Sequence, residues 1–267
     1  VGDLFFGALI PGLILTAAYI VWLLLVGVFR PATCPALPAN TDEHRGLLLR
    51  VVLALLPPMV LVVAVLGSIL AGVATATESA SVGAIGAMAL AASRRRLGMD
   101  MLRGVVQTTA KLTSMAFLLL FGAAVFILVF RGLGGDLLVD EMLRSLPGGM
   151  NAALFVVMAI VFVLGFFLDP FEIIFIIVPI AGPVLITLGA DPVWLGVLLA
   201  LNLQTSFLTP PFGFSLFYLR SVSPPEVTTQ HIYRGIIPFV LIQVLVIALV
   251  WKLPQIATDL PKLLYAN

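Results

Sequence analysis

The sequence contains few of the residues from which soluble proteins build charged surfaces, disulfides and catalytic sites. Of its 267 residues only 10% are charged, two are histidine and one, Cys34, is cysteine. A single cysteine excludes an intrachain disulfide, and so few cysteines and histidines give no pattern for a transition-metal site. The formal net charge of +1 does not indicate a nucleic-acid partner. No metalloprotease, serine-hydrolase, phosphate-binding or dinucleotide-binding motif occurs, so neither an enzyme nor an organic cofactor is predicted.

Apolar residues dominate instead, at 61% of the chain with a mean hydropathy of +1.20. A helix that crosses the hydrocarbon core of a bilayer needs about 20 apolar residues. The apolar runs lack the alternating polarity of barrel strands, and only helices satisfy their backbone in lipid. The sequence therefore predicts an all-α polytopic membrane protein. The uncharged runs that reach or approach a spanning length are 4–29, 51–77, 79–93, 112–130, 146–168, 173–190, 192–219 and 235–251.

Basic residues cluster in three loops, at 30–50, 94–103 and 220–234. Short cytoplasmic loops are enriched in lysine and arginine, so we expect these loops in the cytoplasm and the C-terminus on the outer side. Two segments, 99–111 and 136–146, mix charged and apolar residues. We expect both to form helices that lie along the membrane surface.

Asp169 and Pro170 separate two of the apolar runs, with Glu172 close behind. An N-cap followed by proline at the first helical position is typical of a tight cytoplasmic turn that begins the next helix. Alternatively, runs 146–168 and 173–190 are the arms of a re-entrant hairpin whose tip stops inside the membrane. Both interpretations return the chain to the same side, so the sequence leaves them open.

A second group of polar residues interrupts the apolar run 192–219. Pro210 and Pro211 remove two amide donors and Gly213 permits unusual dihedral angles, so the helix should break there. Carbonyls freed by the break must line an enclosed cavity or meet a ligand, and oxygen atoms suit a small hard cation such as sodium. A proline kink repaired by hydroxyl side chains is the alternative. The polar side chains concerned are Asn202, Gln204, Thr205, Ser206 and Thr209.

The segment 72–83 is rich in small residues and contains one acid, Glu78. Its structural interpretation is a helix start with Thr77 as N-cap, followed by small residues that allow close helix packing. Its functional interpretation makes Glu78 an acid near membrane depth, where Glu172 is a second candidate.

Three stretches of the chain carry a family resemblance. They are GVATATESASVGAIGA at 72–87, FFLDPFEIIFIIVPIAGPVLITLGADPVWLGVLLALNLQTSFLTPPFGFSLFYLRSVSP at 166–224 and, more weakly, IPGLILTAAYI at 10–20. Together they resemble the large membrane subunit of tripartite ATP-independent periplasmic (TRAP) transporters. The stretch 202–220 is most similar to the branch associated with mannitol, chloroaromatic or 2-oxo-acid compounds. The family usually has the motif T-P-T-E, and this chain has Ala76 in place of the proline.

The resemblance implies two inverted repeats, each pairing a re-entrant hairpin with a broken helix, in a carrier that works as an elevator. On that basis 146–219 is the hairpin and broken helix of the transport domain, and 1–145 is mainly scaffold. Residues 220–267 would hold a cytoplasmic loop and the last span. Because one such unit is recognisable, we expect the chain to be the C-terminal three-fifths of the subunit, with the other repeat ahead of Val1.

The implied activity is sodium-coupled import of an organic acid across the bacterial inner membrane, in contact with lipid. A periplasmic binding protein would deliver the acid, and a small four-helix membrane subunit would be the partner. The alternatives are the membrane subunit of an ATP-driven importer and a structural or assembly subunit. Asn202, Gln204 and Thr205 are expected near the substrate. The resemblance implies a sodium site at Asp169, Pro170, Ser206, Thr209, Pro210, Pro211 and Gly213.

Overall fold

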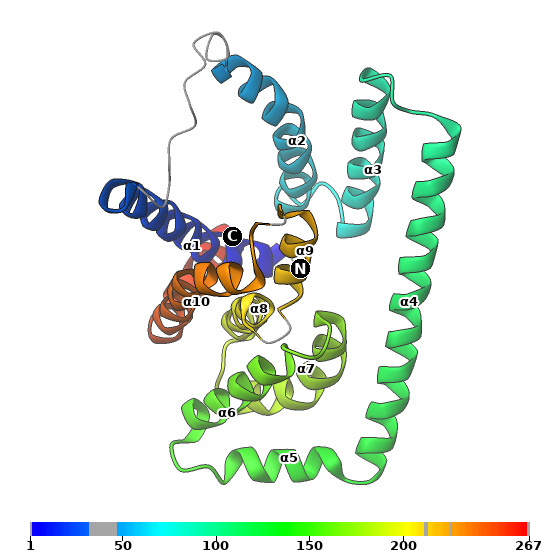
Figure 1. Cartoon of the computed structure of the whole chain (residues 1–267). Helices are drawn as coiled ribbons and strands as arrows, with labels where there is room; N and C mark the ends of the chain where they lie inside the picture. The colour runs from blue at the N-terminus through cyan, green and yellow to red at the C-terminus, as the bar shows by residue number, and fades with distance from the viewer. Residues whose placement is uncertain (1, 32–46, 211–212, 225, 266–267) are drawn as a thin grey trace. The chain divides into compact units, whose positions relative to one another are not determined.

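The chain is built of helices. The computed structural model describes residues 2–31, 47–210, 213–224 and 226–265. Within these ranges it contains no strand, which confirms the all-α prediction. Cys34, His44 and Pro211 lie outside the described residues. The helices, drawn in Figure 1, are α1 (Gly2–Phe29), α2 (Leu47–Leu70), α3 (Ala76–Ser93), α4 (Met99–Gly132), α5 (Gly135–Arg144), α6 (Gly149–Leu164), α7 (Pro170–Thr187), α8 (Pro192–Leu208), α9 (Phe214–Val222), α10 (Thr229–Lys252) and α11 (Gln255–Tyr265).

Among the described residues, five helices are long and apolar enough to cross a membrane, namely α1, α2, α4, α7 and α10. Large apolar side chains on them are exposed, such as Val28 on α1 and Leu118 on α4, which suits surfaces that lipid covers. The apolar helices α6 and α8 have 16 and 17 residues. At 1.5 Å per residue they extend about 24–26 Å, less than the hydrocarbon core of about 30 Å. The chain is therefore a multi-pass membrane protein that also contains two shorter apolar helices.

The helices form two compact units. The first comprises Val1–Phe6 and Ile20–Ala110, and the second comprises Gly7–Tyr19 and Lys111–Asn267. In the second unit α8 is central, because it contacts α6, α7, α9, α10 and α11. The fully buried apolar side chains of this unit include Leu154, Val161, Ile173, Leu185, Leu198 and Val250.

In the first unit α2 and α3 lie close together because one face of α3 carries small residues. A Cβ atom added at Gly83 would lie 3.1 Å from Val65 Cγ2, and one added at Gly86 would lie 2.3 Å from Leu61 Cδ1. These glycines are three residues apart and so lie on one side of the helix. The close packing that the sequence predicts for this segment is therefore present.

Three helix boundaries differ from the expected ones. α2 ends at Leu70 rather than at 77, because Gly72 adopts a positive φ of 68° and turns the chain. Residues 99–132 form the single helix α4, which contains no proline, so 99–111 continues directly into the following span. α11 follows the last span, and no sequence pattern predicts it because it is short and contains Pro261. Its buried residue Ala257 belongs to the core of the second unit.

Candidate functional site

Residues 165–169 join α6 to α7, and the two helices contact each other as a hairpin. Asp169 Oδ1 accepts a hydrogen bond from the backbone N–H of Phe171 at 3.0 Å, and Pro170 is the first residue of α7. Asp169 is therefore an N-cap, as its position before a proline predicts. The depth of this hairpin tip in the membrane stays a prediction.

The predicted break in the run 192–219 is present, since α8 ends at Leu208 and α9 begins at Phe214. Thr209 already has an extended backbone, with φ −98° and ψ 130°. Gly213 has φ +24°, and a Cβ atom there would lie 3.1 Å from the carbonyl oxygen of Phe207. A glycine is thus needed where the chain passes the last turn of α8.

The hydroxyl groups at the end of α8 all donate to carbonyls of their own helix. Thr205 donates to Leu201 at 2.7 Å, Ser206 to Leu203 at 2.8 Å, and Thr209 to Thr205 at 2.8 Å. Thr205 and Ser206 are fully buried. A hydroxyl that has donated its proton keeps oxygen lone pairs, which can accept a hydrogen bond or coordinate a cation.

The hairpin and the end of α8 meet at Gly165, a residue that no sequence motif singles out. A Cβ atom at Gly165 would lie 2.1 Å from Ser206 Oγ and 2.7 Å from Ser206 Cβ. Earlier in both helices, Asn202 Nδ2 donates to the carbonyl of Met158 at 2.8 Å, and Asn202 is buried. Because both contacts join α6 to α8, the first residue of the hairpin turn is fixed against the hydroxyl that precedes the break.

Among the described residues, the other ones that the sequence predicts for the site make no hydrogen bond that joins the hairpin to the α8 break, apart from the Asn202 bond described above. Gln204 is exposed, Glu172 is half-buried in the first turn of α7, and Pro210 lines a groove described below. Asn202 and Thr205 have hydrogen-bond partners inside the protein. The expectation that Asn202, Gln204 and Thr205 lie near a substrate stays a prediction.

One carbonyl that a proline leaves without its helical donor in the second hairpin arm is bound by a side chain from α4. Pro183 has no N–H to donate to the carbonyl of Pro179, four residues earlier in α7. Arg131 Nη2 donates to that carbonyl at 3.4 Å. Further along α7, Arg144 Nη2 donates to the Thr187 hydroxyl at 2.7 Å. Two arginines thus bind this arm.

Glu78 forms part of a capping box at the start of α3. Its Oε2 accepts from the Thr75 N–H at 2.7 Å and from the Thr75 hydroxyl at 2.8 Å, while the Glu78 N–H donates to Thr75 Oγ1 at 3.3 Å. These bonds lower the pKa of Glu78. The prediction of Thr77 as N-cap is wrong, because the hydroxyl three residues before the glutamate closes the box. Ala76 is the first helical residue, where proline would also fit.

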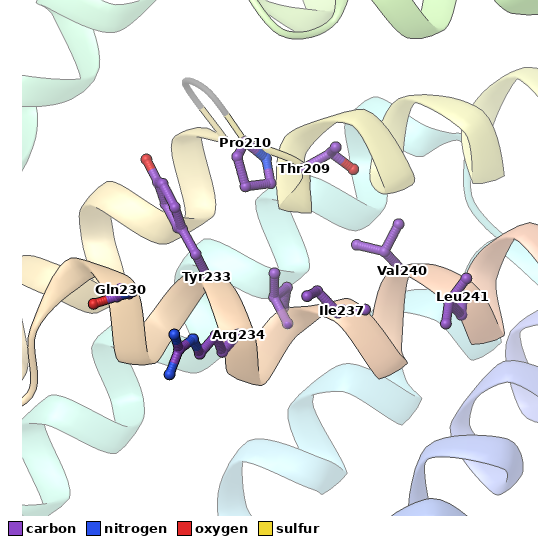
Figure 2. Close-up of a pocket in the computed structure, with 9 residues that line it drawn as sticks. Thr209, Pro210, Gln230, Tyr233, Arg234, Ile237, Val240 and Leu241 are labelled. Atoms are coloured by element: carbon purple, nitrogen blue, oxygen red, sulfur yellow. The ribbon is translucent and has the colours of Figure 1, made fainter.

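A groove of about 300 Å³ lies beside the break (Figure 2). Thr209 and Pro210 line it from the end of α8. Figure 2 shows the polar residues of α10 at one end of the groove and Val240 and Leu241 at the other. On α10 the lining residues are Gln230, Tyr233, Arg234, Ile236, Ile237, Val240 and Leu241.

The chain is similar to known transporter subunits over nearly its whole length. Residues 1–256 match the family described as the tripartite ATP-independent periplasmic transporter, DctM component. The chain is 30% identical over 210 residues to the uncharacterized protein YgiK of Salmonella typhimurium, covering 78% of this chain and 47% of YgiK. It is 27% identical to the C4-dicarboxylate TRAP transporter large permease protein DctM and 29% identical to the sialic acid TRAP transporter large permease protein SiaM, both of Vibrio cholerae.

These matches cover 99% and 98% of this chain but 61% and 60% of the two Vibrio cholerae proteins. The chain thus spans about half to three-fifths of the length of the curated relatives it matches. DctM and SiaM are named as permease proteins, which are transport proteins and not enzymes. The chain belongs to the DctM component family of tripartite ATP-independent periplasmic transporters.

Proposed function

We propose that this chain takes part in sodium-coupled import of an organic acid, with the sodium ion bound where the hairpin meets the α8 break. The contact of Gly165 with Ser206 carries the proposal, because it joins the start of the hairpin turn to the oxygen-rich end of a broken helix. The residues that would form or frame the site are Asp169, Pro170, Ser206, Thr209, Pro210, Pro211 and Gly213.

The chemistry of the break supports a small hard cation. The C-terminal end of a helix carries partial negative charge and carbonyls without intrahelical donors. The hydroxyls of Ser206 and Thr209 point their protons back into α8 and leave oxygen lone pairs for a ligand. In carriers with broken helices, such ends bind the cation while helix N-termini face anionic substrate groups.

Sodium would drive transport by binding the loaded carrier more tightly than the empty one. A ligand shifts an equilibrium only by its difference in affinity for the two states. An ion that links the hairpin tip to the break favours the closed tip, and a closed tip lets residues 146–219 move across the scaffold with the substrate. This is an elevator mechanism.

The names of the relatives support the proposed substrate class and partners. The printed names of the relatives specify C4-dicarboxylate and sialic acid, both of which carry carboxylates. We infer an organic acid for this chain, delivered by a periplasmic binding protein, with a small membrane subunit as partner in the bacterial inner membrane. The C-terminus would be periplasmic, and the substrate would belong to the mannitol, chloroaromatic or 2-oxo-acid branch.

Uptake by proteoliposomes tests the proposal. The natural full-length subunit, its small partner and its binding protein are reconstituted, and uptake of candidate radiolabelled acids is followed with and without an inward sodium gradient. We expect uptake only with the gradient. Uptake that continues without sodium, or that requires ATP, would contradict the proposal.

A further inference from the structure

The groove beside the α8 break has the polarity of a lipid rather than that of a transported acid. We propose that it binds an anionic phospholipid, with the headgroup at Arg234 and one acyl chain along residues 236–241. The groove adjoins the proposed sodium position, because Thr209 and Pro210 line one wall of it.

Arg234 provides the charge for an anionic headgroup. Its guanidinium makes no ion pair or hydrogen bond with any residue that the structure describes. Other arginines of the same unit do have partners: Arg144 pairs with Asp140 and Arg220 donates to the carbonyl of Val227. Arg234 therefore offers all its donors to a phosphate, and Gln230, one turn earlier on α10, adds an amide.

The rest of the lining provides the surface for a hydrocarbon chain. Residues 230–241 of α10 extend about 16 Å at 1.5 Å per residue, and from residue 236 onward the lining side chains of this helix are branched aliphatic ones. A small hydrophilic acid would lose its hydration against this lining without gaining hydrogen bonds. An acyl chain has no such cost, and its burial there is favourable.

The order of the two parts along α10 also matches a phospholipid. α10 is long and apolar enough to span the membrane, and Arg234 lies in its second turn while Val240 and Leu241 lie further along it. The sequence predicts the loop before α10 to be cytoplasmic. A headgroup at Arg234 would then lie at the cytoplasmic interface, with its chain directed toward the bilayer centre. Basic pockets between membrane helices bind anionic lipid headgroups in this arrangement.

Native mass spectrometry tests the proposal on the natural full-length subunit. The purified protein is offered phosphatidylglycerol and phosphatidylcholine with identical acyl chains, and retained lipids are counted. We expect preferential retention of phosphatidylglycerol. Arg234→Gln should lower that affinity about five-fold, the factor for loss of one basic residue near anionic lipid. Val240→Trp fills the groove and should reduce retention of both lipids.

Matched controls lie on the same helix. Lys252→Gln removes a basic residue of α10 outside the groove, and Leu245→Trp enlarges an exposed side chain that does not line it. Both should retain lipid like the wild type. Equal retention of the two lipids by the wild type would overturn the proposal. So would an effect of Arg234→Gln no larger than that of Lys252→Gln, or full retention by Val240→Trp.

Discussion

Two helix junctions of this chain use the same kinds of polar residue in opposite ways. At the α2–α3 junction the polar groups bind one another across two helices. Ser68 Oγ lies 2.8 Å from the carbonyl oxygen of Val65 and 2.7 Å from Ser79 Oγ, and the second contact is a hydrogen bond between the two helices. Glu78 is likewise bound by Thr75 within the capping box. The Ser68–Ser79 bond therefore joins α2 to α3, and the capping box stabilises the start of α3.

At the α8 break the hydroxyls of Ser206 and Thr209 donate only to carbonyls of α8 itself. They therefore donate no hydrogen bond to a second helix. Ser206 is buried and Thr209 is half-buried, and in the proposed function their oxygen lone pairs would coordinate the sodium ion. The neighbouring hairpin approaches through Gly165, which has no side chain to compete for them. The α2–α3 junction therefore has a hydrogen bond between two helices, whereas the hydroxyls at the α8 break bond only within their own helix, and the proposed function assigns their oxygens to a sodium ion.

The largest effect is expected from Gly165→Ala. The new Cβ would lie 2.7 Å from Ser206 Cβ, which is attached to the backbone and cannot rotate away, so we expect a loss of about 1–3 kcal/mol of stability. Sodium-dependent uptake should be lost as well. Thermal unfolding of the purified protein and the uptake assay measure the two effects.

Two further variants make the Gly165 test specific. Gly122→Ala, on α4, has open space around its new Cβ and should leave stability unchanged. Combining Gly165→Ala with Ser206→Gly removes the clashing atoms and should recover part of the stability without recovering sodium dependence. A Gly165→Ala protein as stable as the wild type would contradict the close contact between the hairpin and the end of α8.

Asn202→Ala should lower stability by about 1 kcal/mol, the typical contribution of one buried hydrogen bond. The lost bond is the one from Nδ2 to Met158 that joins α8 to α6. Gln204→Ala, two residues further along α8, removes an exposed side chain and should leave the stability of the protein unchanged. Thermal unfolding compares the pair. Equal stability of the two variants would mean that Asn202 does not hold the hairpin to α8.

Gly86→Ala should cost less than Gly165→Ala, about 1 kcal/mol or less, although its Cβ would also meet a neighbour at 2.3 Å. That neighbour is Leu61 Cδ1, the far end of a flexible side chain that can change rotamer. Unfolding midpoints of the two variants test this difference. If Gly86→Ala is the more damaging, the α2–α3 junction is packed more rigidly than the α8 break.

The smallest effect concerns pH at the α3 cap. The pKa of Glu78 is lowered in the folded protein by hydrogen bonds from Thr75. A depressed carboxyl pKa contributes stability above the unfolded pKa of about 4.5, and this contribution is lost as pH falls through the folded pKa. The stability advantage of the wild type over Glu78→Gln should therefore shrink on acidification, as measured by thermal unfolding across pH. If the stability advantage of the wild type stays constant or grows on acidification, the lowered pKa of Glu78 in the capping box is contradicted.

Composition and proline placement predict much of this fold, because apolar runs in lipid must be helical and prolines must interrupt them. They predict the N-cap at Asp169 and the break after Leu208 for the same local reasons. What the sequence cannot provide is which helices meet. The roles of Gly165 and Arg131 depend on contacts with residues more than 40 positions away. The α10 groove depends on such pairing too, because α8 and α10 line it together.

The sodium concentration for half-maximal uptake tests the difference between the two junctions most directly. Thr209→Val keeps the shape of the side chain and removes its oxygen, whereas Thr75→Ala removes the cap of α3. We predict that Thr209→Val raises the half-maximal sodium concentration about ten-fold, the effect of losing about 1.4 kcal/mol of ion binding. Thr75→Ala should lower stability and leave that concentration unchanged. An unchanged sodium requirement in Thr209→Val, or equal shifts in both variants, would contradict a sodium site at the α8 break.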